Sequence, residues 1–196
     1  MRTNYPVTET FYSLQGEGFH SGKSAYFIRL AGCDVGCTWC DQKETWSAKS
    51  ADVVSNFDLA NMANQVDSSF VVITGGEPTL YNLESLTREI KKPIHLETSG
   101  TRPITGQIDW VTLSPKTFKP VVYENYALAN ELKVVISNES DINFAVTESA
   151  KATKDCHLFL QPDWFNPDSM ATVIEFIKLN PQWRLSLQTH KYIGVR

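Results

Sequence analysis

The chain has 196 residues, 42% of them apolar and 20% charged, which suffices for one folded domain with a core and excludes a disordered, collagenous or coiled-coil protein. The 18 Lys and Arg are outnumbered by 22 Asp and Glu, so the chain lacks the positive field that nucleic-acid binding needs. No apolar run approaches the roughly 20 residues that cross a bilayer, and we expect no targeting segment, no nucleic-acid partner and no membrane partner.

Seven short segments rich in Val, Ile, Phe and Trp predict β-strands, and helical patterns separate several of them. This alternation favours strand-then-helix units around a mainly parallel sheet. The predicted strands are Ala25 to Leu30, Phe70 to Thr74, Ile94 to Glu97, Trp110 to Leu113, Glu131 to Ile136, His157 to Leu160 and Arg184 to Leu187. The segment from Lys116 to Asn130 shows no clear period.

Four segments carry apolar residues at helical spacing, which predicts helices with one buried face. Ser55 and Asp58 are suited to cap the first helix. Asn82 is a candidate cap for the second, and Lys91-Lys92-Pro93 supplies cations and a stop at its end. The predicted buried positions are Leu59, Met62, Ala63 and Val66, then Leu83, Leu86, Thr87 and Ile90, then Ile142, Ala145 and Val146, and finally Met170, Val173, Ile174 and Ile177 after Asn166-Pro167.

The chain shows no linker or internal repeat, so we expect a single domain over residues 1–196. A closed barrel of eight strand-helix units usually needs about 250 residues. The predicted fold is therefore α/β, a shortened and open-sided partial (β/α) barrel of about six strand units.

Polar or glycine-rich motifs follow nearly every predicted strand, at the end where α/β folds gather their functional groups. They are Gly32 to Asp41, Gly75-Gly76-Glu77-Pro78, Thr98-Ser99-Gly100, Ser114-Pro115-Lys116, Ser137 and Gln161-Pro162-Asp163. Together these motifs predict one site at the carboxyl edge of the sheet.

Three cysteines, Cys33, Cys37 and Cys40, form the strongest single signal. Thiolates are soft ligands for zinc or for the iron of an iron–sulfur cluster. A closed zinc site would need a fourth ligand. Cys156 precedes its strand and should lie at the opposite end as a buried thiol, which leaves His20 as the better completing ligand. A four-iron cluster held by three thiolates instead keeps one iron open for chemistry.

The spacing Cys33-x3-Cys37-x2-Cys40 resembles the signature of the radical S-adenosylmethionine (SAM) enzymes, and Gly75-Gly76-Glu77 is similar to their glycine-glycine-glutamate motif. The resemblance implies a [4Fe-4S] cluster whose open iron chelates SAM, and reductive cleavage of SAM to a 5′-deoxyadenosyl radical. It also implies a fold of the radical SAM type, with the glycine-glycine-glutamate motif receiving the SAM ammonium.

Three further stretches narrow the resemblance to one family, the 7-carboxy-7-deazaguanine synthases. They are Phe11 to Gly18, Phe27 to Cys33 and Trp183 to Lys191, and Glu97 to Thr101 and Ser114 to Lys116 also match. The likeness covers nearly the whole chain. It implies conversion of 6-carboxy-5,6,7,8-tetrahydropterin to 7-carboxy-7-deazaguanine with loss of ammonia, by a radical ring contraction on the way to queuosine.

The resemblance also implies roles for individual residues. Those expected at the pterin are Leu14, Gln15, Gly16, Arg29, Thr98 and His190; those expected at SAM are Trp39, Asp41, Gly75, Gly76, Glu77, Gly100, Ser114, Lys116 and Gln161. A guanidinium is also the natural bidentate partner of a substrate carboxylate. A structural alternative stays open for several: a salt bridge for Arg29, plain packing for Trp39, and structural roles for Gln161 and His190. Glu17 is a candidate without a firm role.

The chain departs from the family at Gln42, because the family usually has threonine there to help bind Mg²⁺. A carboxamide oxygen can ligate Mg²⁺, yet the side chain is longer. We therefore expect a weaker or altered dependence on magnesium.

The resemblance further implies a flavodoxin-like or other reductant, a homodimer and a cytoplasmic location. Two other functions remain open at this stage. A glycyl-radical activase shares the cysteine spacing but would lack the start Leu14 to Gly18, and a non-catalytic iron–sulfur or zinc scaffold would need only the metal ligands.

Overall fold

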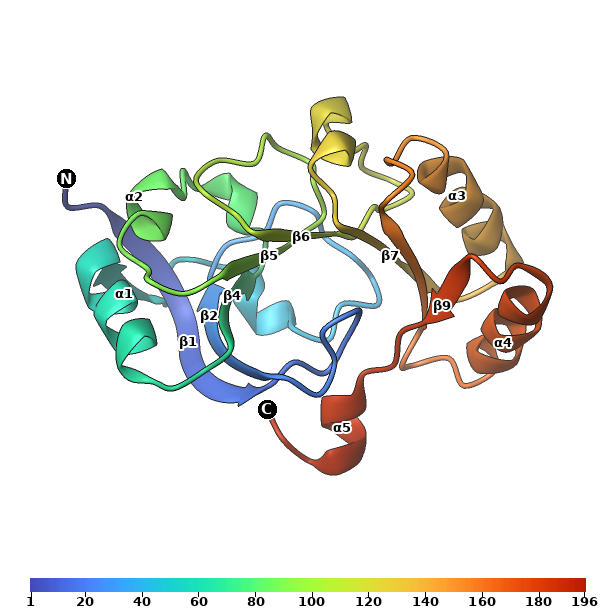
Figure 1. Ribbon diagram of the computed structural model, residues 1–196, viewed down its shortest axis with the longest axis horizontal. Helices are drawn as coiled ribbons and strands as arrows, with labels where there is room; N and C mark the ends of the chain where they lie inside the picture. Colours follow the sequence, from blue (N-terminus) through green and yellow to red (C-terminus); the bar gives the residue numbers. More distant parts are fainter.

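The computed structural model describes residues 1–196, and its centre is one curved sheet (Figure 1). Nine strands lie in the order β3-β1-β2-β4-β5-β6-β7-β8-β9. From β2 onward all neighbours are parallel, whereas β1 pairs antiparallel with both β2 and β3. The edge strands β3 and β9 do not pair with each other, so the barrel stays open. The α/β partial barrel expected from the sequence is confirmed, with seven parallel strands where about six units were expected.

The seven predicted strands are all present with small changes at their ends. Their bounds are β2 Ser24–Leu30, β4 Phe70–Gly75, β5 Ile94–Thr98, β6 Trp110–Leu113, β7 Glu131–Ile136, β8 His157–Pro162 and β9 Trp183–Leu185. The sequence did not predict β1 (Asn4–Leu14) or β3 (Asp52–Ser55), which form the antiparallel edge.

A β-bulge in β1 explains why its alternation is hard to read in the sequence. Val7 lies opposite Leu30, but Glu9 lies opposite Arg29, so one extra residue separates these two pairs. The extra residue moves the side chains that follow it to the other face of the sheet. Val7 is consequently buried in the core, whereas Glu9 faces the cavity described below.

Helices α1 to α4 cover the outer, convex face of the sheet (Figure 1). Their bounds are α1 Asn56–Gln65, α2 Glu84–Thr87, α3 Glu139–Ser149 and α4 Ser169–Leu179, with short 3-10 helices at Lys43–Trp46, Pro78–Leu80 and Tyr123–Ala127. Ser55 caps α1 as predicted, because its hydroxyl accepts a hydrogen bond from the Asp58 amide. None of the helices has both the length and the apolar character needed to cross a membrane.

Five details of the predicted helices are wrong. The second helix ends at Thr87 instead of continuing to Ile90, and Lys92 donates hydrogen bonds to Ala63 and Val66 at the end of α1 rather than capping its own helix. Val146 and Ile174 are exposed, and α4 begins at Ser169 rather than at Pro167. These helix faces are set by how each helix lies on the sheet, which spacing alone does not fix.

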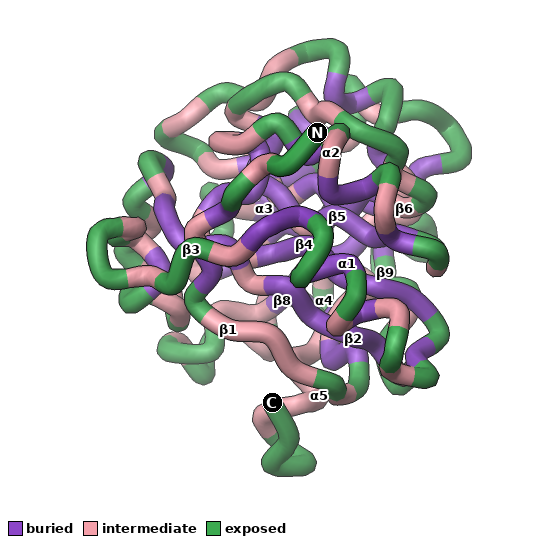
Figure 2. The backbone as a smooth tube through the Cα atoms, turned by 90° about the vertical axis from the view of Figure 1, so that its left-hand side faces the viewer, coloured by how far each residue is buried: buried purple, intermediate pink, exposed green.

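The core lies between the convex face of the sheet and these helices, in two clusters. One packs β1, β2, β4 and β5 against α1 and α2, and the other packs β6, β7, β8 and β9 against α3 and α4. Cys156 is a buried member of the second cluster, which confirms its predicted role as an apolar thiol. Buried residues concentrate in the strands, while α5 (Thr189–Ile193) lies apart from the other helices and buries none of its residues (Figure 2).

Candidate active site

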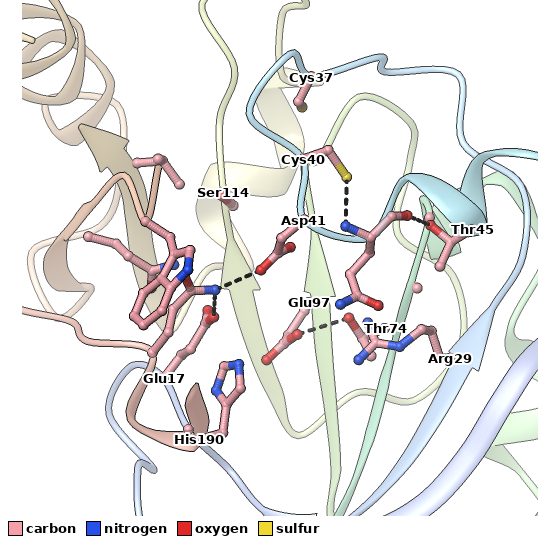
Figure 3. Close-up of a pocket in the computed structure, with 18 of the residues that line it drawn as sticks. Glu17, Arg29, Cys37, Cys40, Asp41, Thr45, Thr74, Glu97, Ser114 and His190 are labelled. Atoms are coloured by element: carbon pink, nitrogen blue, oxygen red, sulfur yellow. Dashed lines mark hydrogen bonds between the residues drawn. The ribbon is translucent and has the colours of Figure 1, made fainter. Parts of the chain in front are cut away.

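A cavity of about 780 Å³ opens at the carboxyl ends of the parallel strands, a volume typical of small-molecule sites. Its lining comes from the loops after β2, β4, β5, β6 and β8, from β1, and from the C-terminal segment. Every site residue predicted from the sequence lines it, with the exception of Gly100. Figure 3 shows the thiols of Cys37 and Cys40 at one end of this cavity, Glu17, Glu97 and His190 toward the other, and Asp41 between them.

The loop after β2 supplies all three predicted metal ligands. Cys33, Cys37 and Cys40 are free, half-buried thiols that line the same cavity. Burial raises the pKa of the Cys37 thiol above its ordinary value, while the nearby Lys116 ammonium acts in the opposite direction. The Cys40 sulfur accepts a hydrogen bond from the Gln42 amide at 3.4 Å.

Neither residue considered as a fourth zinc ligand is near this loop. Cys156 lies in the core, and His20 packs against Phe70, His95 and Trp110, which begin β4 or lie early in β5 and β6, at the opposite end of the sheet. No group of three His, Cys, Asp or Glu side chains is placed so that it could hold a single metal ion. Three thiolates that each bind a different iron of a cluster need no such arrangement.

The two glycines after β4 are required by close backbone approach. A side chain at Gly75 would meet the Leu30 carbonyl oxygen at 2.0 Å, and one at Gly76 would meet the Gly32 carbonyl oxygen at 2.2 Å. Gly75 also has a φ of +143°, which disfavours other residues. The glycines therefore bring the end of β4 directly against the start of the cysteine loop.

The Glu77 carboxylate is almost fully buried and is held by protein donors on both oxygens. Its Oε1 accepts from the Thr79 amide at 3.0 Å and from the hydroxyls of Thr79 and Thr98, and its Oε2 accepts from the Ser99 amide at 2.9 Å and from the Ser99 hydroxyl. One negative charge thus ties the loop after β4 to the loop after β5, at the wall of the cavity.

Gly100 lies outside the cavity, so the structure gives no support to its predicted contact with SAM. A side chain there would meet the Leu113 methyl carbon at 2.3 Å, and the residue has a φ of +72°. Its carbonyl accepts hydrogen bonds from Val122 and from the Asn125 amide group. The glycine is explained by the packing of this loop.

Ser114 and Lys116 follow β6 and lie together on the cavity wall. The Lys116 ammonium donates to the Ser114 carbonyl at 2.8 Å and to its hydroxyl at 2.6 Å. Burial lowers the pKa of Lys116, and the neighbouring thiol of Cys37 works against that shift. Gln161, after the middle of β8, is also buried at the cavity, and its carboxamide oxygen accepts from Ser186 at 2.9 Å.

Arg29 forms a salt bridge, which is the structural role that the sequence left open for it, and it also lines the cavity. Its Nε donates to Glu9 Oε1 at 2.9 Å across the β1–β2 pair. The pairing uses Nε only, since neither Nη atom has a protein acceptor. Both Nη atoms are therefore free to receive a carboxylate.

The N-terminal signature forms the far end of the cavity. Gln15 donates to one oxygen of Glu97 at 2.9 Å. Thr74 donates to the other oxygen of Glu97, also at 2.9 Å (Figure 3). A side chain at Gly16 would meet the His190 ring at 2.1 Å, so this glycine allows the C-terminal segment to pack directly on the signature. Leu14 is the last residue of β1 and is partly exposed at the rim.

Glu17 has a defined partner that the sequence did not reveal. Its carboxylate pairs with the Lys133 ammonium from β7, and both side chains are largely buried. Burial raises the pKa of Glu17, but Lys133 outweighs it and the net pKa lies below the ordinary value. The pKa of Lys133 is lowered by burial and raised more strongly by Glu17, Glu97 and Glu131, so the lysine stays charged.

The C-terminal segment connects the two ends of the cavity. The Gln188 carboxamide donates to Glu17 at 2.9 Å and to Asp41 at 3.1 Å (Figure 3), and Lys191 pairs with Asp41. Burial raises the pKa of Asp41, but Lys191 reverses this and holds it below its usual range. Trp39, two residues before Asp41, contacts the Phe118 ring edge-on at 5.7 Å while lining the cavity.

Several cavity residues were given no role from the sequence, although some of them lie within the stretches that match the family. They are Glu9, Phe11, Thr74, Glu97, Lys133, Gln188, Lys191 and Arg196. Lys133 carried a usable signal, because a lysine between the apolar residues Leu132 and Val134 of a buried strand needs a buried partner. The others depend on strand pairing and on where the C-terminal segment packs.

Comparison with known proteins agrees with this geometry. The profile of the radical SAM superfamily matches residues 27–135. A 7-carboxy-7-deazaguanine synthase from Synechocystis is 48% identical, covering 100% of this chain and 96% of its own length. Those from Flavobacterium psychrophilum (44%, covering 97% and 92%) and Escherichia coli K12 (37%, covering 97% and 99%) are similar along almost their whole lengths.

A solved structure gives the same answer for the fold. The crystal structure of QueE from Escherichia coli superposes with a TM-score of 0.85 and 35% identity, covering 95% of each chain. Together with the three-cysteine loop and the glycine-glycine-glutamate turn at one cavity, these similarities establish the family. The chain belongs to the radical SAM superfamily and, within it, to the 7-carboxy-7-deazaguanine synthases.

Proposed function

We propose that this protein makes 7-carboxy-7-deazaguanine from 6-carboxy-5,6,7,8-tetrahydropterin, with loss of ammonia, as a step in queuosine biosynthesis. The product is the compound for which its full-length relatives are named. The observation that carries the proposal is that one cavity brings together the three-cysteine loop and the signature Gln15 to Glu17, although 15 residues of chain separate Glu17 from Cys33.

The residues fit a [4Fe-4S] cluster at the cysteine loop. Three free thiols line one wall of the cavity. Gly76, which follows β4, lies directly against Gly32 and Cys33, so no side chain from that residue stands between the two loops. When bound, the cluster and SAM would together supply the 5′-deoxyadenosyl radical that takes a hydrogen atom from C6 of the pterin. The role of Cys33, Cys37 and Cys40 in this proposal is to bind three of the four irons.

The wall beside the cysteine loop fits SAM. Backbone groups at Gly75 and Gly76 are accessible because neither residue has a side chain. Glu77 is fully hydrogen-bonded to the protein, so we propose that it attracts the SAM ammonium through its charge and positions Thr98 and Ser99. The remaining proposed SAM contacts are Trp39, Asp41, Ser114, Lys116 and Gln161.

The far end of the cavity fits a carboxylated pterin. We propose that the free Nη atoms of Arg29 bind the substrate carboxylate, with Glu9 fixing the guanidinium through Nε. Gln15, Gly16 and His190 would then border the ring system, joined by Leu14 and Thr98. The closed packing of His190 on Gly16 supports a role in excluding water from the bound pterin.

Gln42 is the residue that we propose for magnesium, and the proposal is that it binds the ion weakly. Its side chain lines the cavity two residues after Cys40. Thr45, the next threonine in the chain, is fully buried and donates its hydroxyl to the Gln42 carbonyl at 2.7 Å, so it does not replace the missing family threonine. The carboxamide oxygen stands at the end of a longer side chain than the hydroxyl of the family threonine, which would displace the ion and favours weaker binding.

We also propose three properties that the cavity itself does not address. A flavodoxin-like or other low-potential reductant would supply the electron. The active form would be a homodimer, by analogy with the family. A reducing cytoplasm suits the four free thiols.

The test is turnover by the anaerobically reconstituted protein with SAM, dithionite and 6-carboxy-5,6,7,8-tetrahydropterin. The proposal predicts 7-carboxy-7-deazaguanine and ammonia in equal amounts, identified by mass and absorbance. Arg29→Met should raise the KM for the pterin without changing cluster content, and Cys156→Ala is the matched control that should do neither. Iron-loaded protein that binds SAM but forms no product would refute the proposed activity.

A further inference from the structure

Asp34, the residue directly after the first cluster cysteine, makes contacts that the proposed reaction does not use. Its Oδ2 accepts a hydrogen bond from Arg102 Nη2 at 2.7 Å and lies 2.9 Å from Lys119 Nζ. Lys119 Nζ also donates to the Asp34 carbonyl oxygen at 2.8 Å. The side chain is therefore held from two directions by two cations.

These two cations belong to the loops that complete the cavity wall. Arg102 follows β5, a few residues after Thr98, and Lys119 follows β6, three residues after Lys116. The backbone amide of Lys119 donates to the Lys116 carbonyl at 3.2 Å, so a turn joins the two lysines. Asp34 thus links the cysteine loop to both neighbouring loops at once.

The cysteine loop has little else to fix its conformation. None of the backbone N–H groups of residues 34 to 39 donates a hydrogen bond, either to backbone or to a side chain. Gly36 has a φ of +77° and adds no side chain. Besides Asp34, the loop is anchored by the buried Val35, by the contact between Trp39 and Phe118, and at its ends by hydrogen bonds from the Cys33 amide to the Trp46 carbonyl and from the Cys40 amide to the Cys37 carbonyl.

We propose that Asp34 is a positioning residue that holds the Cys33–Cys40 loop in its cluster-binding conformation before iron and sulfide arrive. The two ion pairs are partly exposed, so they contribute little to global stability. Their effect falls on a segment in which the N–H groups of residues 34 to 39 donate no hydrogen bonds, and there a small energy shifts the local opening equilibrium. This inference depends on the proposed function in one respect, because it takes the Cys33–Cys40 loop to bind an iron–sulfur cluster.

The first test uses the cluster-free protein and measures amide hydrogen exchange. Asp34→Asn keeps the size of the side chain and removes its charge. We expect exchange of the Cys33 and Cys40 amides, which donate hydrogen bonds to Trp46 and Cys37, to rise roughly threefold to tenfold, the range available from two partly exposed ion pairs, with no change elsewhere. Glu84→Gln, which breaks the more exposed pair with Arg88 at 2.6 Å, is the matched control and should leave these two amides unchanged. Equal exchange in Asp34→Asn and wild type would overturn the proposal.

The second test measures the rate at which reconstituted protein loses iron to a chelator. Asp34→Asn and Arg102→Gln should each accelerate the loss, and the double variant should be no faster than the faster single variant, because Arg102 contacts the loop only through the Asp34 carboxylate. Additive acceleration, or no acceleration, would contradict the proposal. If wild type takes up no cluster, the proposed function fails, while the exchange experiment still decides the role of Asp34.

Discussion

Removing the Lys133 ammonium tests whether the buried charges at the far end of the cavity are mutually dependent. Lys133 pairs with Glu17 and lies near Glu97 and Glu131, and its side chain is only 8% exposed. In Lys133→Met the three carboxylates would lose their only buried cation. We expect the variant to fold with much lower stability and to bind the pterin poorly.

The magnitude follows from the burial of the pair. Breaking a buried ion pair by removing one partner costs about 3 to 5 kcal/mol. The exposed pair Arg88–Glu84, with 62% and 60% of the side chains exposed, should contribute only about 0.3 to 0.5 kcal/mol and serves as control. In a chain of this size each kcal/mol lowers Tm by roughly 2 to 4 °C, so Lys133→Met should melt roughly 6 to 20 °C below wild type and Glu84→Gln within about 2 °C of it.

The pH dependence gives an independent check. The lowered pKa of Glu17 means that its contribution to stability is present above its unfolded pKa and is lost as the pH falls. Without Lys133 the buried carboxylate gains by binding a proton, so the deficit of Lys133→Met should be larger at pH 8 than at pH 5. Glu17→Gln in the same chain should recover part of the loss. A deficit below about 1 kcal/mol, equal at both pH values, would refute the reasoning.

Three further perturbations follow from the structure. Burial, with smaller effects of the His20 and Lys23 charges, lowers the pKa of His95 to about 3, so the unfolded chain binds the extra proton below pH 6.5. Lowering the pH from 7.5 to 5.5 should therefore cost wild type about 1.4 kcal/mol more than His95→Phe in urea unfolding, and parallel curves would contradict this. Gly75→Ala should cost at least about 2 kcal/mol, because the added methyl meets the Leu30 carbonyl oxygen at 2.0 Å. A melting temperature within roughly 2 °C of wild type, which corresponds to about 1 kcal/mol or less, would contradict it. Omitting Mg²⁺ should lower product formation less in wild type than in Gln42→Thr, and the reasoning fails if wild type loses all activity while the variant responds identically.

Much of the fold could be predicted because its central strands are short apolar runs, each followed by a glycine or polar turn. The strand Trp110–Leu113 is an example, with matching predicted and observed ends. The antiparallel edge could not be read in the same way. In β1 the bulge near Val7 breaks the alternation, and three polar residues between Val7 and Phe11 obscure the rest.

The site was predictable where chemistry demands local residue types, as in the cysteine loop and the Gly75-Gly76 turn. It was not predictable where partners are distant in the chain. The salt bridge of Arg29 depends on the register of β1, and the bridge from Gln188 to Glu17 and Asp41 depends on how the C-terminal segment packs. Neither contact leaves a pattern in the nearby sequence.

The most direct measurement of the central claim is the electron paramagnetic resonance spectrum of the reduced, reconstituted protein with and without SAM. A cluster bound by Cys33, Cys37 and Cys40 has one iron free of protein ligands, so adding SAM should change its g values in wild type and in Cys156→Ala. In Cys37→Ala the cluster signal should be lost. A wild-type spectrum that SAM leaves unchanged, or an intact cluster in Cys37→Ala, would contradict the account.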